Sequence, residues 1–333
     1  MKKFLRISLI GTAVSAIIYF GAALIMAFLP APTFTVDPFP VAQHAEVAHT
    51  PQQYTMRDGE TLFARQFPAE SDTTILLVHG VTSESSAFNV SAQQLQAVSG
   101  AEVVAIDLRG HGQSGGTVGD VDYIGQYQDD VVDVITAIQT EKPNGRIILA
   151  GHSMGGGIGL QFAQLEDAPA VDGYLFFAPH LGSNAPTMPQ PNPDATAAEI
   201  EAAAAYSQLH VPRLIGLIML EQVGVKGLGH LDTLFFNLTD DVTHTYSFRA
   251  TANAAPQDYV AALTAVNAPM LVVVGSNDEA FVADEFPSAI TSHSDGEVHI
   301  IDGENHNSIV ESAAAMSIIQ NWLDETELTS SNS

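Results

Sequence analysis

Short apolar runs with the composition of buried strands recur along most of this chain, separated by segments with helical spacing. The strand-like runs occupy residues 74–79, 102–106, 146–150, 171–178, 270–275 and 298–301. Because they are apolar at successive positions and not at alternate ones, each strand must be covered on both faces. Repeated strand–helix units of this kind form a mostly parallel sheet with helices on both sides. We therefore expect an α/β fold.

Helical spacing and turn signals complete this pattern. Helices are expected over residues 87–98, 123–139 and 307–323, and a glycine-rich turn after residue 150 leads into another that ends near Leu165. The runs 52–56 and 61–67 flank Asp58-Gly59, a pair typical of a hairpin turn. We expect this hairpin to lie at the edge of the sheet.

The strand–helix alternation breaks once, between residues 178 and 270. About 90 residues lie in this interval, far more than one crossover needs. It holds an Asn/Pro-rich segment at 184–194, an Ala-rich helix pattern at 195–205 and apolar tracts at 211–220 and 228–238. We expect residues 180–245 to form a helical insertion that covers one edge of the sheet, between core segments 54–179 and 246–325. The tract that ends at Leu220 is too short to cross a bilayer and is interpreted as a buried helix.

Charge and cysteine content exclude several kinds of function. The chain has 11 Lys plus Arg against 38 Asp plus Glu, a net charge of −27, and so acidic a surface repels nucleic acid. Cysteine is absent, which excludes disulfides, thiol nucleophiles and cysteine-ligated metals. The 12 histidines show no H-E-x-x-H spacing, and the glycine-rich turn lacks the acid of a dinucleotide fingerprint, so we expect neither metal nor cofactor. His79, His111 and His152 are expected to hold loops by hydrogen bonds.

The N-terminus carries a different pattern. Lys2, Lys3 and Arg6 precede an uncharged stretch from Ile7 to Leu29, and the first acidic residue is Asp37. As a helix this stretch would be about 34 Å long, enough for a hydrocarbon core of about 30 Å. Basic residues before it and acids after it predict a membrane anchor with a cytoplasmic N-terminus and an exported, extracytoplasmic domain. A cleaved signal peptide, followed by secretion, is the alternative.

Two further segments are expected to lie outside the globular core. Residues 37–53 include Pro38, Pro40 and Pro51 and predict an extended tether that follows the anchor or signal segment, residues 1–36. The globular part then starts near Tyr54. At the other end, residues 326–333 are expected to form a disordered tail.

A glycine-flanked serine follows one of the strand runs and opens a helix pattern. The five residues are Gly151-His152-Ser153-Met154-Gly155, which fit G-x-S-x-G in the strand–turn–helix context that this motif requires. A Cβ at Gly151 or Gly155 would collide with neighbouring chain in so sharp a turn. The turn lifts the Ser153 hydroxyl out of the sheet, and we expect this group to be a nucleophile.

A serine hydroxyl is a weak nucleophile until a base takes its proton. In this context the partners follow in the order Ser, acid, His. Asp278 comes shortly after one strand run and His306 after the last, so both lie at the carboxyl edge where Ser153 is expected. We expect His306 to relay the proton and Asp278 to hold the imidazole, with Asp302 and Glu304 as alternative acids.

An acyl intermediate also needs hydrogen-bond donors for its oxyanion. One expected donor is the backbone N–H of Met154, the residue after the nucleophile. The other is the backbone N–H of Val81, in the loop His79-Gly80-Val81-Thr82 that follows the first buried strand. The alternative is that this loop is only a tight turn.

Six motifs follow one another in order along the chain. They are Asp58-Gly59-Glu60-Thr61-Leu62, Leu77-Val78-His79-Gly80, Asp107-Leu108-Arg109-Gly110-His111-Gly112-Gln113-Ser114, Gly151-His152-Ser153-Met154-Gly155-Gly156, Gly275-Ser276-Asn277-Asp278 and His306. Over residues 54–323, without the insertion, the chain resembles an α/β-hydrolase of the lysophospholipase/monoacylglycerol lipase-like group. The resemblance implies an eight-stranded sheet, a lid, ester hydrolysis without a cofactor, and the site roles given above. One departure is Thr82-Ser83-Glu84, where the group often has another glycine, and it bears on the shape of the oxyanion loop.

We therefore expect a serine hydrolase that cleaves carboxylic esters through an acyl-enzyme on Ser153. The apolar insertion and the membrane anchor favour lipid-like esters such as monoacylglycerol or lysophospholipid. The alternatives are an amide or peptide hydrolase or an acyltransferase with the same three residues, and a non-catalytic hydrolase-like binding protein. The expected partners are an ester substrate and a membrane, without nucleic acid or an obligate protein partner.

Overall fold

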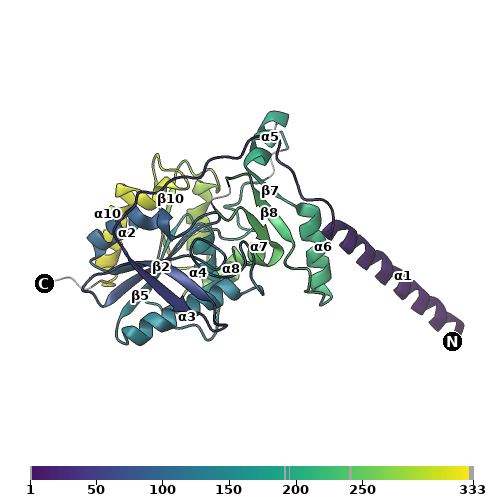
Figure 1. Cartoon of the computed structure of the whole chain (residues 1–333), viewed down its shortest axis with the longest axis horizontal. Coiled ribbons are helices and arrows are strands. Elements are labelled where there is room, and N and C mark those ends of the chain that lie inside the picture. Colours follow the sequence, from purple (N-terminus) through teal and green to yellow (C-terminus); the bar gives the residue numbers. More distant parts are fainter. Residues whose placement is uncertain (1, 191–192, 195, 240–241, 330–333) are drawn as a thin grey trace.

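An eight-stranded sheet forms the centre of the computed structural model, which describes residues 2–190, 193–194, 196–239 and 242–329 (Figure 1). The strand order is β1-β2-β4-β3-β5-β6-β10-β11. The bounds are β1 Thr50–Thr55, β2 Thr61–Phe67, β3 Thr73–Val78, β4 Glu102–Ile106, β5 Arg146–His152, β6 Gly173–Phe177, β10 Met270–Gly275 and β11 Glu297–Ile301. The predicted α/β fold is confirmed, and so is the strand number that the resemblance implied.

The sheet is mostly parallel. Strand β2 runs antiparallel to β1 and β4, and the pairs from β4 across to β11 are parallel. The predicted hairpin joins β1 to β2 at one edge. Its turn contains Gly59 at a φ of 89°, a conformation that glycine adopts without strain, and the Met56 amide donates to the Glu60 carbonyl oxygen at 2.8 Å.

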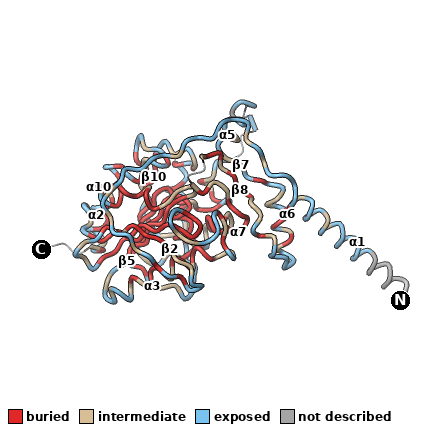
Figure 2. The backbone as a smooth tube through the Cα atoms, viewed as in Figure 1, coloured by how far each residue is buried: buried red, intermediate tan, exposed pale blue. Residues whose placement is uncertain are grey.

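Successive residues of the inner strands face two separate hydrophobic clusters. On β3, Leu76 and Val78 belong to one cluster and Ile75 and Leu77 to the other. Figure 2 shows these strands as the buried centre of the molecule. Because both faces are covered, an apolar side chain at every position is stabilising, at about 1.5–3 kcal/mol for each fully buried Leu or Ile.

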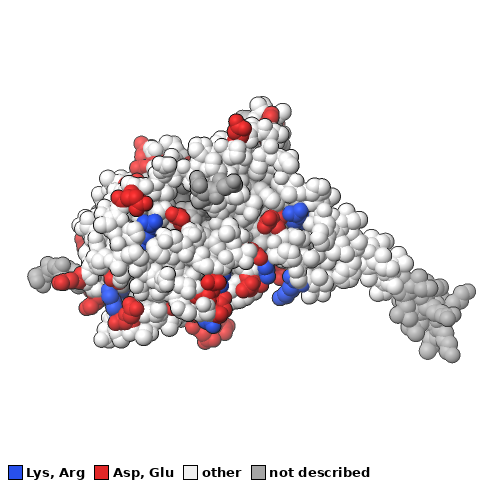
Figure 3. All heavy atoms as spheres, viewed as in Figure 1, with Lys and Arg blue, Asp and Glu red and all other residues white. Residues whose placement is uncertain are grey.

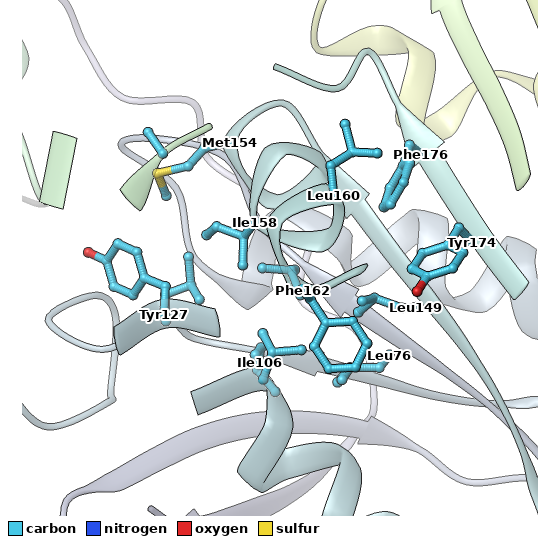
Figure 4. Close-up of a cluster of buried hydrophobic side chains, with 14 of the residues drawn as sticks. Leu76, Ile106, Tyr127, Leu149, Met154, Ile158, Leu160, Phe162, Tyr174 and Phe176 are labelled. Atoms are coloured by element: carbon cyan, nitrogen blue, oxygen red, sulfur yellow. The ribbon is translucent and has the colours of Figure 1, made fainter. Parts of the chain in front are cut away.

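Helices close the two faces of the sheet. One face packs against α3 Gln126–Glu141 and α4 Met154–Ala163, and the other against α2 Asn89–Ser99 and α10 Ala313–Glu325. Figure 4 shows Leu76 and Leu149 of the sheet near Phe162 of α4. These four helices cover the two faces on which the sequence pattern placed helices.

The C-terminal part contains short helices that the sequence did not predict. The expected helix over residues 307–323 is interrupted: a 3₁₀ turn, η3 Ser308–Glu311, precedes α10. Ser312 lies between them in an extended conformation, and its side chain accepts a hydrogen bond from the Ala315 amide, which makes it the helix cap. The unpredicted helices are α7 Phe248–Asn253, α8 Tyr259–Ala265 and α9 Phe286–Thr291.

The insertion is not purely helical, which corrects the prediction for residues 180–245. Its helices are α5 Ala197–Tyr206 and α6 Val211–Gln222. Beside them lies a second, antiparallel sheet in the order β7-β8-β9, formed by β7 Ser207–Leu209, β8 Asp232–Phe236 and β9 Thr245–Ser247. In β8, Thr233 and Phe235 are more buried than their neighbours, a period of two that is typical of a strand with one covered face. Residues 191, 192 and 195 lie outside the described residues.

The N-terminal helix α1 Lys2–Ala27 packs against α6 of the insertion (Figure 1). The side chain of Arg213 holds the end of α1, because its Nε donates to the Ala27 carbonyl oxygen at 2.9 Å and its Nη2 to the Leu29 carbonyl oxygen at 2.8 Å. The Tyr19 hydroxyl donates to the Met219 carbonyl oxygen at 2.8 Å. A Cβ at Gly216 would lie 2.5 Å from the Ala23 carbonyl oxygen, so the two backbones touch.

A membrane-spanning helix within residues 1–36 is not confirmed. Among the residues described by the structure, no helix has both the length and the hydropathy to cross a membrane. The side chains of Lys2, Lys3 and Arg6, on which the predicted orientation depends, lie outside this part.

The predicted tether and tail are both bound to the folded part. The Phe39 amide donates to the Asn237 carbonyl oxygen at 2.8 Å, and the Asn89 side chain donates to the Ala45 carbonyl oxygen at 2.8 Å. The globular part therefore begins before Tyr54. Leu328 is buried and its carbonyl oxygen accepts from the Thr73 hydroxyl, so residues 326–329 are not a disordered tail. Residues 330–333 lie outside the described residues.

Replacement of Gly216 by alanine is expected to separate α1 from α6. The added methyl group would meet backbone atoms, which cannot move aside cheaply, and overpacking of this kind costs about 1–3 kcal/mol. Thermolysin cleavage between residues 28 and 36 should become about tenfold faster. In Gly227→Ala the new Cβ has no neighbour within 4 Å, and cleavage should match that of the unchanged chain. Equal rates for both variants would show that the close contact does not hold α1.

Candidate active site

Ser153 lies directly after β5, at the carboxyl edge of the sheet and at the start of α4. Its backbone has a φ of 52° and a ψ of −116°, which is strained for a residue with a side chain. A Cβ at Gly155 would lie 2.0 Å from the Val78 carbonyl oxygen, and one at Gly151 would lie 2.4 Å from the carbonyl carbon of Gly155. Both positions therefore require glycine because a Cβ atom would not fit there, as the motif predicts.

The strained turn is held by backbone hydrogen bonds on both sides. The Ser153 amide donates to the Phe177 carbonyl oxygen at 3.0 Å, and its own carbonyl oxygen accepts from the His180 amide at 2.9 Å. Both partners belong to the end of the neighbouring strand β6 and the residues after it. The serine is thus tied to the end of β6, with the helix α4 beginning at the next residue.

His306 and Asp278 meet at the same edge. The His306 Nδ1 lies 2.8 Å from Asp278 Oδ2 and donates to it, since an ionised carboxylate can only accept. Asp278 Oδ1 accepts the amides of Ala280 at 2.9 Å and Phe281 at 2.8 Å, and its side chain is fully buried. With its proton on Nδ1, the imidazole keeps Nε2 as the basic nitrogen.

The backbone of His306 is also held from two sides. His152, next to Ser153 in the chain, donates its Nε2 hydrogen to the His306 carbonyl oxygen at 2.8 Å, and the two ring centroids lie 4.7 Å apart. The His306 amide donates to Glu279 Oε2 at 3.0 Å. These contacts place the imidazole beside His152, the neighbour of Ser153 in the chain, and no hydrogen bond joins Ser153 to His306 among the described residues.

The alternative acids have other partners. Asp302 accepts from the Ser276 hydroxyl at 3.4 Å, and Glu304 accepts from the Ser308 hydroxyl at 2.5 Å. Of the three candidate acids, Asp278 is therefore the one that forms a hydrogen bond with His306 in the described part of the chain. Glu279 was not singled out from the sequence, although its position directly after Asp278 is a signal that could have drawn attention to it.

The two predicted oxyanion donors lie on either side of Ser153. Met154 is the first residue of α4, where free amides and the helix dipole favour negative charge. A Cβ at Gly80 would lie 3.1 Å from Ser153 Cβ, so the loop that carries Val81 passes close to the serine. Within the described part of the chain, no hydrogen bond engages the amide of Val81 or of Met154.

The buried histidines around the site do hold loops. His79 Nδ1 donates to the Gly80 carbonyl oxygen at 2.8 Å, and its Nε2 accepts from the Leu108 amide at 3.0 Å. Burial lowers the pKa of His79 to about 4. Burial and, secondarily, another histidine nearby lower the pKa values of His111 and His152 to about 3. All three are neutral at pH 7 and can accept as well as donate.

One more residue at this edge was missed by the sequence reasoning. His180 follows β6 and stacks on Phe281 with ring centroids 5.4 Å apart, and Phe281 lies edge-on to His306 at 5.2 Å. Its buried Nε2 has no hydrogen-bond partner among the described residues, and burial lowers its pKa to about 4. His180 follows the end of a strand, as Ser153 does, and this position in the sequence could have indicated it.

Comparisons with known proteins agree with this arrangement. The family described as "Serine aminopeptidase, S33" matches residues 69–313. A monoacylglycerol lipase of Mycolicibacterium smegmatis is 31% identical over 150 residues, which cover 40% of this chain and 53% of the relative. A monoglyceride lipase of Rattus norvegicus is 30% identical over 129 residues, 38% of this chain and 42% of the relative. The matched segments thus span about half the length of these curated relatives or less.

Solved structures share the fold at lower identity. An esterase from the thermophile Thermogutta terrifontis superimposes with a TM-score of 0.57 at 18% identity, over 83% of this chain and 99% of the other. A bacterial membrane phospholipase A superimposes with a TM-score of 0.55 at 18% identity, over 98% of this chain and 99% of the other. At this identity the likeness establishes the α/β-hydrolase fold.

Replacement of Asp278 by asparagine is expected to lower kcat by about 10⁴-fold. The amide keeps the shape but turns a donor toward Nδ1, which moves the imidazole proton to Nε2 and removes the base. Steady-state hydrolysis of a p-nitrophenyl ester measures the effect, with KM expected to change little. Asp302→Asn is the matched control, because Asp302 contacts Ser276 and not His306. Similar losses in the two variants would contradict the assignment of the acid.

Stability is expected to fall as the pH falls below about 6.5. The pKa values of His79, His111 and His152 are about 4, 3 and 3 in the folded chain, whereas an unfolded histidine has a pKa of about 6.5. The unfolded state therefore binds protons first, and each group contributes up to about 1.4 kcal/mol per pH unit until its folded pKa is reached. Urea unfolding between pH 7.5 and 5.0 measures this slope. His79→Asn should reduce it, and an unchanged slope would contradict the burial of a neutral imidazole.

Proposed function

Because this chain belongs to the family described as serine aminopeptidase, S33, and has the α/β-hydrolase fold, we propose that it hydrolyses carboxylic esters through an acyl-enzyme on Ser153. The observation that supports this most directly is the buried Asp278 carboxylate, 2.8 Å from His306 Nδ1, beside a serine in a strained turn. Nucleophile, base and acid come from three strand ends of one sheet, in the order that ester hydrolysis on this fold requires.

In the first half of the reaction, the Ser153 oxygen attacks the ester carbonyl carbon and its proton passes to His306 Nε2. The carbonyl π electrons move to the oxygen, which becomes an oxyanion, and the amides of Val81 and Met154 donate to it. Asp278 stabilises the imidazolium. When the tetrahedral intermediate collapses, the C–O bond to the alcohol breaks and His306 protonates the leaving oxygen.

In the second half, water replaces the alcohol. His306 Nε2 takes a proton from the water, whose oxygen attacks the acyl carbon, and a second oxyanion forms in the same place. Collapse releases the carboxylic acid, and the proton returns from His306 to the Ser153 oxygen. Throughout, His152 and Glu279 hold the His306 backbone in place.

For the substrate we propose a neutral lipid ester of the monoacylglycerol kind. Two curated relatives are a monoacylglycerol lipase and a monoglyceride lipase. The insertion exposes apolar side chains suited to an acyl chain, namely Leu209, Val211, Ile215 and Ile218. Figure 3 shows acidic side chains over the core surface with few basic ones, and such a surface repels anionic headgroups. Lysophospholipids with a net negative charge are therefore disfavoured.

A peptide substrate is the second candidate, because the family description names an aminopeptidase. A free peptide amino group would need a carboxylate near the serine, and Glu279 is the carboxylate that contacts the His306 backbone. That carboxylate already accepts the His306 amide, which favours a positioning role for Glu279. The ester reading is therefore preferred.

A substrate panel on the full chain tests the proposal. Monoacylglycerols of 4, 8, 12 and 16 acyl carbons, a lysophosphatidylglycerol and aminoacyl naphthylamides are compared by kcat/KM, with Ser153→Ala as the blank. We expect a monoacylglycerol to be the best substrate and Ser153→Ala to lose all turnover. A fluorophosphonate probe should label the unchanged chain and leave Ser153→Ala unlabelled.

The outcomes separate the candidates. Turnover of naphthylamides above esters would replace the ester proposal by the peptidase one. Equal labelling or turnover in Ser153→Ala would exclude Ser153 as the nucleophile. A chain that is neither labelled nor active on any of these compounds would support a non-catalytic binding protein.

A further inference from the structure

Thr82, the last residue of the proposed oxyanion loop, has a φ of 56°. This left-handed conformation is uncommon for residues other than glycine, and it is an outlier for a β-branched one. The cost is about 1–3 kcal/mol, so the conformation persists only when surrounding contacts hold it. Thr82 therefore needs contacts that hold its backbone in this conformation.

The partner of the Thr82 backbone amide is Tyr246 on β9, in the sheet of the insertion, and the Thr82 side chain has a hydrogen bond with Tyr206. The Thr82 amide donates to the Tyr246 hydroxyl oxygen at 2.6 Å. Tyr246 is 1% exposed, whereas Thr82 is partly exposed, so the acceptor of this hydrogen bond is buried. The two residues are 164 positions apart in the chain, and the contact joins the loop after β3 to the insertion.

The Tyr246 hydroxyl also forms a hydrogen bond with His111, and this second bond decides where the hydroxyl proton lies. The hydroxyl oxygen lies 2.9 Å from His111 Nε2, and His111 Nδ1 donates to the Arg109 carbonyl oxygen at 2.9 Å. With its proton on Nδ1, the neutral imidazole accepts the Tyr246 proton at Nε2. The phenol oxygen is then free to accept from Thr82, and the chain of bonds runs from the loop amide to a buried histidine.

Both peptide groups around Val81 are fixed in this way. His79 donates to the Gly80 carbonyl oxygen at 2.8 Å, which orients the peptide group that contains the Val81 amide. Tyr246 accepts the Thr82 amide and so orients the next peptide group. The Val81 amide hydrogen is left directed away from His79 by the planarity of its peptide bond.

From these contacts we propose that Tyr246 is a positioning residue that keeps the Val81 amide in the geometry required by the oxyanion. The inference rests on the proposed ester hydrolysis and assigns part of the catalytic geometry to the insertion. Among the described residues the Tyr246 hydroxyl has hydrogen bonds to Thr82 and His111 and none to Ser153, so it acts through Thr82. Without its hydroxyl, the strained loop is expected to relax and to turn the Val81 amide away.

The chain contains a matched control for this test. Tyr127 is also fully buried, its ring centroid lies 6.3 Å from that of His111, and its hydroxyl oxygen has no partner among the described residues. Tyr246→Phe and Tyr127→Phe each remove one buried hydroxyl and keep the ring. Only the first removes a hydrogen bond to the loop.

The test compares the two variants in the full chain with a p-nitrophenyl ester and two inhibitors. Loss of one oxyanion donor costs about 10²–10³-fold, so a displaced donor should lower kcat by about 10- to 100-fold in Tyr246→Phe, with KM nearly unchanged. Affinity for a trifluoromethyl ketone, which forms an oxyanion on the serine, should fall by a similar factor. Affinity for the fatty acid product should stay constant. Tyr127→Phe should change none of these values by more than about twofold.

A second variant separates positioning from general packing. Glycine adopts a φ of 56° without strain, so Thr82→Gly needs less support from the Tyr246 hydroxyl. The loss caused by Tyr246→Phe should therefore be smaller in the Thr82→Gly background, where the relieved strain also favours a folded double variant. Equal losses in both backgrounds, or equal kcat in Tyr246→Phe and Tyr127→Phe, would overturn the inference. If Ser153→Ala kept activity, the proposed function would fail instead.

Discussion

The close approach of α4 to the end of β3 is the constraint on which the site depends. At Gly155 the helix backbone comes so near the Val78 carbonyl oxygen that no Cβ fits, and at Gly151 the strand meets the helix that follows it. This contact forces the chain through a turn in which Ser153 takes a strained backbone conformation. Gly80, two residues after Val78, lies close to Ser153. The packing of α4 against the end of β3 therefore places both the nucleophile and the oxyanion loop.

The buried carboxylate of Asp278 extends this order to the base. It has two oxygens and three donors: two backbone amides on one oxygen and the imidazole on the other. A fully buried charge is stable only with such partners, and here they also fix the tautomer of His306. The same hydrogen bonds therefore stabilise the buried Asp278 carboxylate and orient the His306 imidazole.

The sequence predicts those parts of the fold and the site that depend on local pattern. Continuous apolar runs predicted the sheet, Asp58-Gly59 the hairpin, and strand ends the positions of Ser153, Asp278 and His306. Strands β7 and β9 of the insertion were missed because each has three residues, too few positions to show a period. The tail prediction failed at Leu328 because this residue packs into a hydrophobic cluster of the core and its carbonyl oxygen accepts from Thr73, which is far away in the chain.

Long-range contacts of this kind also explain why Tyr246 could not be found from the sequence. Its neighbours in the chain form a short edge strand, and nothing local indicates that its hydroxyl meets the Thr82 amide. Arg213 joins α1 and α6 to the Asp232 carbonyl oxygen of β8, and β8 pairs with β9. Contacts therefore continue from the N-terminal helix through the insertion to the strained loop. Since the hydrogen bond to the Thr82 amide comes from β9, a folded insertion is part of what makes the oxyanion loop competent.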